Sequence, residues 1–586
     1  MGANETFPDE LRERAEAWLA GDPDETTRAE LRAILERSDE AELAERFGQN
    51  IEFGTAGLRG LLGAGTNRMN RAVVIRTSLG FVRYLASQMP EAAERGIVVG
   101  YDARRMSRTF AEDAAGVFAA AGIRVHWFGD VVPTPLVAFA VGFLGAAGGV
   151  VITASHNPAA YNGYKIYWSN GAQIVAPHDE AIAREILAAP PANAIARAAM
   201  ESAEAKRRVA TLSGEVQARY VDGVRAMALA PHVRPSLSIV YTPLHGVGYP
   251  ILERAMAASG FEVCGVPEQL APDPDFPTAP FPNPEEKGVL DLGLDLGRRR
   301  KADLLLANDP DADRLAVAVR NEQGDLVQLS GNQVGVLLGH YLLTEDRRPG
   351  EGAVLATIVS SPMLGEIARC FGVHYEETLT GFKWIATRAI ELEKEGTRFI
   401  FGYEEALGYA SFNLVRDKDG ISAAVLFAEL AAVCKAKGTT VFQHLSSLYR
   451  RFGLYASAQR SLTMAGQEGA ASIARMMNAL RSDPPEQIAE RGVLERRDHA
   501  ARIRVQSDGQ SQPLFLPASD VLAYDLEGDS RIMVRPSGTE PKLKFYFDHR
   551  EPVAPDESIA AAESRALREI ARLDGAIVAL ARSIPG

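Results

Sequence analysis

The sequence predicts an α/β protein: three successive, similar α/β domains with mixed, mostly parallel sheets, followed by a smaller C-terminal α+β domain. Short apolar runs such as GIVVGYD and GGVVITAS alternate with helical stretches such as TFAEDAAGVFAAAG. This alternation is typical of helices that cover a parallel sheet. The pattern occurs three times along the chain, and a segment of different character follows it.

The elements in chain order divide the sequence into five parts. In the first fifty residues, Thr27 and Glu30 have the spacing of a capping box ahead of Leu31, which predicts the start of a helix. An Ala- and Pro-rich segment separates the first α/β part from the second, and a long Ala-rich amphipathic helix ends the last part. We expect a helical extension at 1–50, a first α/β domain at 51–205, a second at 206–325, a third at 326–454 and the C-terminal domain at 455–586.

Length and charge restrict the classes of function. A chain of 586 residues has the length of about four ordinary domains. The formal net charge of −13 disfavours nucleic acid and anionic membranes as partners, because both need a basic face. We therefore expect a small-molecule substrate, and an anionic one would have to be held by local cations.

The cysteines and the apolar segments predict a cytoplasmic protein. Cys264, Cys370 and Cys434 lie far apart and form no CxxC pair, so neither a disulfide framework nor a zinc site is indicated. The sequence contains no basic and apolar leader at its start and no long charge-free stretch that predicts a membrane span.

Ser155 stands in a loop that follows a predicted strand. Val150, Val151 and Ile152 form a short β-branched run, and the TASHNP that follows is typical of a loop. His156 lies beside the serine, and Lys165 lies on the strand that we expect next. Ser155 in this position can be a nucleophile. Alternatively, the Ser-His-Asn-Pro turn only satisfies backbone groups at the end of the strand.

A second loop, NDPDADR, predicts a metal site. Asp309, Asp311 and Asp313 occupy alternate positions between two apolar strands, where they can converge on one hard cation and leave room for a phosphate oxygen or water. The loop is not an EF-hand, because Arg314 and Arg320 occupy its sixth and twelfth positions. The alternative is a solvated acidic turn, in which the clustered carboxylates would repel one another.

Two further loops carry candidate substrate-binding residues. RPSGTEPK offers hydroxyls, backbone N–H groups and a guanidinium, which together suit a phosphate, although the same residues also fit an ordinary hairpin turn. GYEEALGY follows a strand, and its carboxylates can accept hydrogen bonds from sugar hydroxyls or can begin a helix. The candidates are Arg535, Ser537, Gly538 and Thr539 in the first loop and Glu404 and Glu405 in the second, with the single cations Arg59 and Lys383 elsewhere.

TASHNP, DPDADR, GYEEALGY and RPSGTEPK, in this order, resemble the motifs of the α-D-phosphohexomutases, the phosphoglucomutase and phosphomannomutase superfamily. The match spans nearly the whole chain. FGTAGLRG, NGYKIYWSNGAQI and the GYEEALGY form of the sugar loop are similar to the type-2 phosphoglucomutase branch, whose relatives include phosphopentomutases and glucose-1,6-bisphosphate synthases. The resemblance implies four domains around one central cleft.

The resemblance also implies roles for the candidate residues. Ser155 would be the phosphoserine nucleophile, and its phosphate would hold Mg²⁺ together with Asp309, Asp311 and Asp313. His156 and Lys165 would flank the reaction as proton-transfer or phosphate-neutralising groups. Arg59, Arg314 and Lys383 would complete a cationic lining; Glu404, with Glu405 beside it, would contact the sugar; Arg535, Ser537, Gly538 and Thr539 would bind the phosphate that is not reacting.

The implied activity is a phosphosugar mutase that interconverts an aldose 1-phosphate and 6-phosphate through the phosphoserine and a sugar 1,6-bisphosphate. Tyr403 and Ala406 replace the glycine and serine of the family's commoner Gly-Glu-x-Ser loop. Because Glu404 is placed to contact hydroxyls away from both phosphates, glucose 1-phosphate is the expected substrate and mannose 1-phosphate a slower one. Ribose 1-phosphate is an alternative, because the type-2 branch includes pentose enzymes. A sugar bisphosphate synthase is a further alternative. A phosphatase would not need the second phosphate loop, and a non-catalytic sensor would not need the serine.

Overall fold

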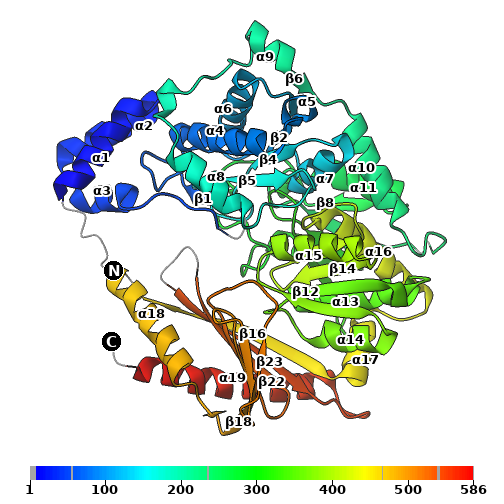
Figure 1. The fold of residues 1–586 in the computed structure, drawn as a ribbon. Coiled ribbons are helices and arrows are strands. Elements are labelled where there is room, and N and C mark those ends of the chain that lie inside the picture. The colour runs from blue at the N-terminus through cyan, green and yellow to red at the C-terminus, as the bar shows by residue number, and fades with distance from the viewer. Residues whose placement is uncertain (1–7, 55–56, 234–235, 465, 538–541, 585–586) are drawn as a thin grey trace. The chain divides into compact units, whose positions relative to one another are not determined.

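The computed structural model describes residues 8–54, 57–233, 236–464, 466–537 and 542–584 (Figure 1). The chain divides into two compact units, each of which we describe by itself. The first unit contains Met1–Val319, Asp325–Gln328 and Gly408–Ala432, and the second contains Arg320–Gly324, Leu329–Leu407 and Val433–Gly586.

Three helices open the described part of the first unit: α1 (Pro8–Gly21), α2 (Glu25–Arg37) and α3 (Glu40–Phe47). The predicted start of a helix at Thr27 is wrong. Helix α2 begins at Glu25, because the extended backbone of Asp24 (φ −106°, ψ 117°) lets its carboxylate accept a 2.9 Å hydrogen bond from the Thr26 N–H. Thr27 therefore lies in the first helical turn.

A mixed six-stranded sheet forms the first α/β layer, in the order β1-β5-β4-β2-β3-β6. Strands β4, β2, β3 and β6 are parallel, whereas β5 runs antiparallel to both β4 and β1. The strands are β1 (Leu58–Leu61), β2 (Ile97–Tyr101), β3 (Val125–Trp127), β4 (Gly148–Ile152), β5 (Tyr161–Trp168) and β6 (Val209–Thr211). The helices are α4 (Arg71–Gln88), α5 (Ala92–Arg95), α6 (Ser107–Ala120), α7 (Thr134–Leu144), α8 (His178–Leu187), α9 (Ala203–Arg208) and the 3₁₀ turn η1 (Ala192–Ala194). Strands β2 and β4 are buried throughout, which explains their continuous apolar sequence.

The second sheet has five strands in the order β11-β10-β9-β7-β8, with β8, β7 and β9 parallel and β10 antiparallel to β9. The strands are β7 (Ile239–Thr242), β8 (Val263–Gly265), β9 (Leu304–Ala307), β10 (Ala316–Arg320) and β11 (Leu326–Gln328). The helices are α10 (Glu215–Ala226), α11 (Tyr249–Ala258), α12 (Asp291–Arg300) and the 3₁₀ turn η2 (Pro267–Gln269). The chain returns to the first unit at β15 (Gly408–Ser411) and stays in it through most of α16 (Gly420–Ala436).

In the second unit, three parallel strands lie side by side in the order β13-β12-β14. They are β12 (Gly352–Thr357), β13 (His374–Thr378) and β14 (Arg398–Glu404). The accompanying helices are α13 (Gly331–Glu345), α14 (Met363–Phe371), α15 (Phe382–Lys394), α17 (Val441–Phe452) and the 3₁₀ turn η3 (Pro349–Glu351). The strand, helix and strand order is the third repetition that the sequence predicts.

The C-terminal part is an eight-stranded, antiparallel sheet in the order β16-β23-β22-β21-β18-β19-β20, with β17 paired to β18. The long helix α19 (Ile559–Ser583) lies along it beside β16 and β23 (Figure 1). The other elements are β16 (Leu454–Thr463), α18 (Gly466–Ser482), β17 (Gln487–Ile488), β18 (Arg491–Asp498), β19 (Ile503–Gln506), β20 (Ser511–Pro513), β21 (Leu522–Leu526), β22 (Ser530–Pro536) and β23 (Lys542–Glu551).

These sheets confirm the predicted fold class, three α/β layers with mixed sheets and a C-terminal α+β part. The residue limits drawn between the parts stay a prediction. Among the helices that the structure describes, none has both the length and the apolar character needed to span a membrane.

Candidate active site

Ser155 lies in the loop between β4 and β5 of the first unit. Its side chain is buried, and its Oγ is 2.6 Å from Oδ2 of Asp309 and 3.1 Å from Nδ1 of His156. The backbone has a left-handed conformation with φ +51°, and its N–H donates to the Thr153 hydroxyl at 2.8 Å. A non-glycine residue in this conformation costs about 1–3 kcal/mol and persists only where its surroundings hold it.

Arg104 supplies that restraint. Its buried guanidinium donates to the carbonyl oxygens of Ser155 at 2.6 Å and Pro158 at 2.9 Å, and also to that of Asn157. Asp102 lies 3.3 Å from its Nε. Arg104 was not predicted from the sequence. Its YDARR segment begins at the end of β2, and only the parallel pairing of β2 with β4 in the structure brings it to the same sheet edge as the serine loop.

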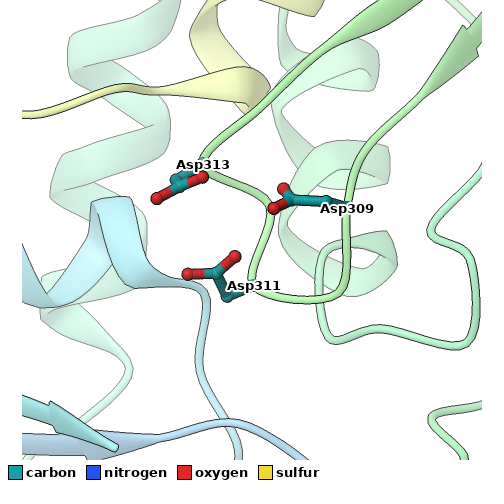
Figure 2. Close-up of side chains that lie close together, drawn as sticks. All are labelled: Asp309, Asp311 and Asp313. Atoms are coloured by element: carbon teal, nitrogen blue, oxygen red, sulfur yellow. The ribbon is translucent and has the colours of Figure 1, made fainter. Parts of the chain in front are cut away.

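The three predicted aspartates gather on the loop between β9 and β10 (Figure 2). All three are buried, and one carboxylate oxygen of each lies within 4.8 Å of the others. The Oδ1 atoms of Asp311 and Asp313 are buried and have no hydrogen-bond partner among the described residues. Buried carboxylate oxygens in this state need a cation or another partner. The cluster could therefore hold a metal ion.

Lys165 lies against this cluster. It projects from β5, where it pairs with Val151 of β4, and its Nζ is 2.8 Å from Oδ2 of both Asp311 and Asp313. Burial acts to lower the pKa of Lys165, but these two carboxylates outweigh it and raise the pKa. The ammonium group is therefore charged at neutral pH.

Lys418 is a second lysine at the cluster, and it was not predicted from the sequence. Its Nζ lies 3.2 Å from Oδ2 of Asp313 and 3.6 Å from Oδ1 of Asp417. Asp417 is held in turn by the hydroxyl of Tyr167 at 2.7 Å and by Gln173 at 2.6 Å. The signal was the charged RDKDG segment next to a buried helix, but nothing local to it indicates contact with a loop one hundred residues earlier.

The aspartates differ in their electrostatic surroundings. Burial, followed by the neighbouring carboxylates Asp311 and Asp313, raises the pKa of Asp309 well above its usual range. Burial also acts to raise the pKa of Asp313, but Lys165 and Lys418 outweigh it and lower the pKa. Asp309 is therefore the member of the cluster that would gain most from a bound cation.

His156, Arg59 and Arg314 complete this group. Desolvation, together with the positive charges of Arg314 and Arg59, lowers the pKa of His156 well below 6.5, so its imidazole is neutral at pH 7. Arg59 on β1 donates to Oδ1 of Asn157 at 3.1 Å. The Arg314 N–H donates to Oδ1 of Asp309 at 3.0 Å. The fold thus brings together every candidate predicted in the first unit.

The remaining candidates belong to the second unit. Glu404 is buried at the end of β14. Glu405 follows it; its N–H donates to the Ser360 hydroxyl at 3.1 Å, and its carboxylate accepts from Thr357 and Ser360 at 3.2 and 3.3 Å. Lys383 lies in the first turn of α15, with its Nζ 5.8 Å from the centre of the Trp384 ring. The hydrogen bonds to Thr357 and Ser360 occupy the Glu405 carboxylate, which the sequence predicted to contact the sugar.

The predicted phosphate loop lies between β22 and β23. Arg535 is the second-last residue of β22. Burial raises the pKa of Tyr546 on β23, and the charge of Arg535 acts to lower it. The Ser537 N–H donates to the Lys542 carbonyl at 2.7 Å, which closes the base of the loop. Gly538 and Thr539 lie outside the described residues.

Comparison with known families matches all four parts of the chain. The models of the phosphoglucomutase/phosphomannomutase alpha/beta/alpha domains I, II and III match residues 50–192, 218–324 and 330–452, and the C-terminal domain model matches 478–566. The chain belongs to this family. It is therefore an enzyme of the phosphosugar mutase class.

Individual relatives agree with this assignment. The chain is 38% identical over 556 residues to a probable phosphoribomutase of Schizosaccharomyces pombe, covering 92% of this chain and 93% of that protein. It is also 38% identical over 512 residues to a probable phosphomannomutase of Haemophilus influenzae, covering 86% and 98%. The crystal structure of a putative phosphomannomutase from Thermus thermophilus has the same fold, with a TM-score of 0.64, 23% identity and coverage of 89% and 99%.

Proposed function

We propose that the enzyme moves a phosphoryl group between the 1-position and the terminal hydroxyl of an aldose, and that Ser155 carries the group between the two. The observation on which this rests is the position of the Ser155 Oγ, which lies 2.6 Å from Asp309 and 3.1 Å from the neutral His156. A buried serine with a proton acceptor on one side and a cation-binding cluster on the other has the parts of an activated nucleophile.

His156 is the proton carrier at Ser155 in this proposal. When Ser155 takes a phosphoryl group from the sugar bisphosphate, its Oγ proton passes to Nδ1 of His156 and on to the sugar oxygen that leaves. In the return step, the attacking sugar hydroxyl gives its proton to His156, and the Ser155 Oγ regains it as the phosphoryl group departs. Lys165 is less suited to this task, because the carboxylates of Asp311 and Asp313 raise its pKa and keep it protonated. Its charge instead offsets that of the aspartates and of the phosphate.

Mg²⁺ is the metal that we propose for the aspartate cluster. Three carboxylates with oxygen atoms that have no partner suit a hard cation, and Asp309, Asp311 and Asp313 would hold it together with a phosphate oxygen of Ser155. The bound ion would offset the charge that develops on the transferring phosphoryl group.

The residues of the second unit would hold the rest of the substrate. Glu404 would accept hydrogen bonds from sugar hydroxyls, and Arg535 with Ser537 would bind the phosphate that is not reacting. Lys383 would add positive charge, and Glu405 would hold the sugar loop through Ser360. A bisphosphate that reorients between the two proposed phosphate sites would present each of its two phosphates to Ser155 in turn.

Glucose 1-phosphate and ribose 1-phosphate are the two main candidates for the physiological substrate. The loop with Glu404 favours glucose 1-phosphate, with mannose 1-phosphate as a slower substrate. Ribose 1-phosphate is the second candidate, because a probable phosphoribomutase is 38% identical over 92% of this chain. Measuring kcat/KM for the three 1-phosphates side by side, with Mg²⁺ and the matching bisphosphate, decides between them. A preference of tenfold, about 1.4 kcal/mol in transition-state binding, assigns the sugar.

The same assay separates the other classes of function. A mutase yields the terminal phosphate of the sugar, a phosphatase yields free phosphate, and a sugar-phosphate sensor yields neither. A bisphosphate synthase would accumulate the bisphosphate. We further propose a cytoplasmic location, since Cys264, Cys370 and Cys434 are all unpaired thiols.

A further inference from the structure

A proline-rich segment, residues 271–287, lies between η2 and α12 of the first unit and has no part in the function proposed above. Six of its residues are prolines: Pro272, Pro274, Pro277, Pro280, Pro282 and Pro284. Each proline fixes its own φ angle and also restricts the residue before it. A segment of this composition has few conformations available, so it can hold a side chain in a fixed place.

The segment is anchored near both of its ends. The N–H of Asp273 donates to the His245 carbonyl at 3.0 Å, and the hydroxyl of Thr278 lies 2.7 Å from Nε2 of the same histidine. Towards the other end, the Gln328 side chain donates to the carbonyl of Pro284 at 2.8 Å. These bonds attach the segment to the loop after β7 and to β11.

Phe276 connects the segment to Arg104, which restrains the backbone of Ser155. The Phe276 side chain is buried, and the centre of its ring lies 4.8 Å from the guanidinium carbon of Arg104. Its backbone is left-handed, with φ +47°, which is unusual for a bulky residue and costs about 1–3 kcal/mol. The neighbouring Asp275 forms an ion pair with Arg105. The segment is therefore fixed with respect to the loop that carries Ser155.

Phe281, further along the segment, lies against the imidazole of His156. The two rings are stacked, with 6.4 Å between their centres and 22° between their planes. Among the residues that the structure describes, the only other hydrogen bond or ring contact of this imidazole joins its Nδ1 to the Ser155 Oγ at 3.1 Å. The Cβ–Cγ torsion of histidine has broad preferences, so the ring needs a neighbour to keep Nδ1 directed at Ser155.

We propose that Phe281 is a positioning residue for His156, and that its ring, held by the proline-rich segment, keeps Nδ1 of the imidazole directed at the Ser155 Oγ. This inference rests on the proposed function, in which His156 carries the proton. The contact between Nδ1 and the Ser155 Oγ changes when Ser155 carries the phosphoryl group, because the Oγ then has no proton. The stacking with Phe281 does not depend on that group, so it can hold the ring through both steps.

Steady-state kinetics of the full-length protein test the role of Phe281, with Mg²⁺ and with glucose 1-phosphate or ribose 1-phosphate, whichever the wild type turns over faster. Phe281→Leu stays apolar but lacks the flat ring, and it should lower kcat at least tenfold with little change in KM. Phe281→Tyr keeps the ring and should restore most of kcat. A raised KM at unchanged kcat would overturn the proposal and make Phe281 a substrate contact. Equal losses of kcat in the two variants would also overturn it.

Phe143→Leu is the matched control. Phe281 is 40% exposed and Phe143 on α7 is 43% exposed, and Phe143 also stacks on a ring, that of Phe139, with 5.6 Å between the centres. The control makes the same change at an exposed, stacked ring of the same unit, and it should leave kcat unchanged. An equal loss of kcat in Phe143→Leu and Phe281→Leu would show a general effect on the unit and would refute the positioning role.

The double variant His156→Ala with Phe281→Leu separates this inference from the proposed function. Removal of the imidazole should lower kcat by about 100- to 10,000-fold, the usual contribution of a general base, and Phe281→Leu should then lower it no further. Independent effects of the two substitutions would overturn the role of Phe281 and leave the proton carrier in place. A His156→Ala variant with wild-type kcat would instead refute the proton carrier, and this inference with it.

Nuclear magnetic resonance gives a readout that does not depend on turnover. In protein labelled with ¹³C at histidine Cε1, the His156 resonance is the one that disappears in His156→Ala. Phe281→Leu should shift this resonance, because a stacked aromatic ring shields the imidazole, and Phe143→Leu should not. A His156 resonance that stays in place in Phe281→Leu would overturn the proposal.

Discussion

Ser155 and Asp309 are 154 residues apart in sequence, and the serine Oγ donates a 2.6 Å hydrogen bond to the aspartate Oδ2. The serine follows a strand of the first sheet, and the aspartate follows a strand of the second. A second hydrogen bond joins the first two α/β layers, because the hydroxyl of Thr134 at the start of α7 donates to Asp311 at 2.7 Å. The chemistry that we propose therefore requires the first two α/β layers to pack together.

Mg²⁺ should raise the unfolding temperature of the wild-type protein, and Asp309→Asn should abolish the rise. A ligand that binds only the folded state stabilises it, and Asp309 is the carboxylate whose pKa burial and neighbouring charges raise most clearly. Differential scanning fluorimetry with and without Mg²⁺ measures the effect. The control is Asp113→Asn, which should keep the Mg²⁺ response. Asp113 is also a buried aspartate, and it pairs with Arg71 at 2.7 Å. The same rise in both variants would contradict the metal assignment.

Lys165→Met should destabilise the first unit by about 3–5 kcal/mol, because it leaves two buried carboxylates without their shared cation. Hydrogen exchange of the β4 and β5 amides reports the free energy of opening in this region. The double variant Lys165→Met with Asp311→Asn should regain part of the loss, since it removes one of the uncompensated charges. A double variant less stable by the sum of both single effects would argue against this ion-pair network.

Arg104→Lys should lower kcat by about 100-fold, since small displacements of reacting groups have effects of this size. A lysine ammonium keeps the charge, but it lacks the planar fork that donates to the Ser155 and Pro158 carbonyls together. KM should change little, because Arg104 acts through the position of the serine. Steady-state kinetics measure both constants, with the exposed Arg124→Lys as control. A raised KM at unchanged kcat would assign Arg104 to substrate binding instead.

Arg535→Gln should raise KM at least tenfold and leave kcat much less affected. A charge-assisted hydrogen bond to phosphate is worth about 1.5–3 kcal/mol, and a phosphate that does not react keeps this bond in both the ground state and the transition state. The variant should also release bisphosphate into solution, which a coupled assay detects. Arg496→Gln on the same sheet is the matched control. Unchanged KM without release of bisphosphate would mean that Arg535 only shapes the hairpin.

Local sequence patterns were sufficient to predict the loops that carry Ser155 and the three aspartates. A short β-branched run predicts a buried strand, and the polar residues directly after it must then lie at the sheet edge. Hydrophobic periodicity likewise predicted the repeated α/β layers. The start of α2 was misplaced, because Asp24 and Thr27 are both good N-cap residues and only the backbone conformation at Asp24 decides between them.

The roles of Arg104 and Lys418 could not be predicted in the same way. Arg104 contacts the serine loop about fifty residues later, and Lys418 contacts Asp313 about one hundred residues earlier. Charged residues are usually solvated on the surface, and burial of these two follows only from the packing of distant segments. The pairing of Glu405 with Thr357 and Ser360 is of the same kind.

The central claim, that Ser155 carries the phosphoryl group, is tested most directly by intact-protein mass spectrometry together with turnover of an aldose 1-phosphate. Wild-type protein treated with the sugar 1,6-bisphosphate should gain the mass of one phosphoryl group, and Ser155→Ala and Ser155→Gly should gain none. Both variants should isomerise the sugar at least a thousandfold more slowly, as expected when a nucleophile is removed. Glycine adopts the left-handed conformation at φ +51° without strain, so its loss of activity would not reflect misfolding of the loop. Either variant retaining activity within tenfold of the wild type would contradict the account.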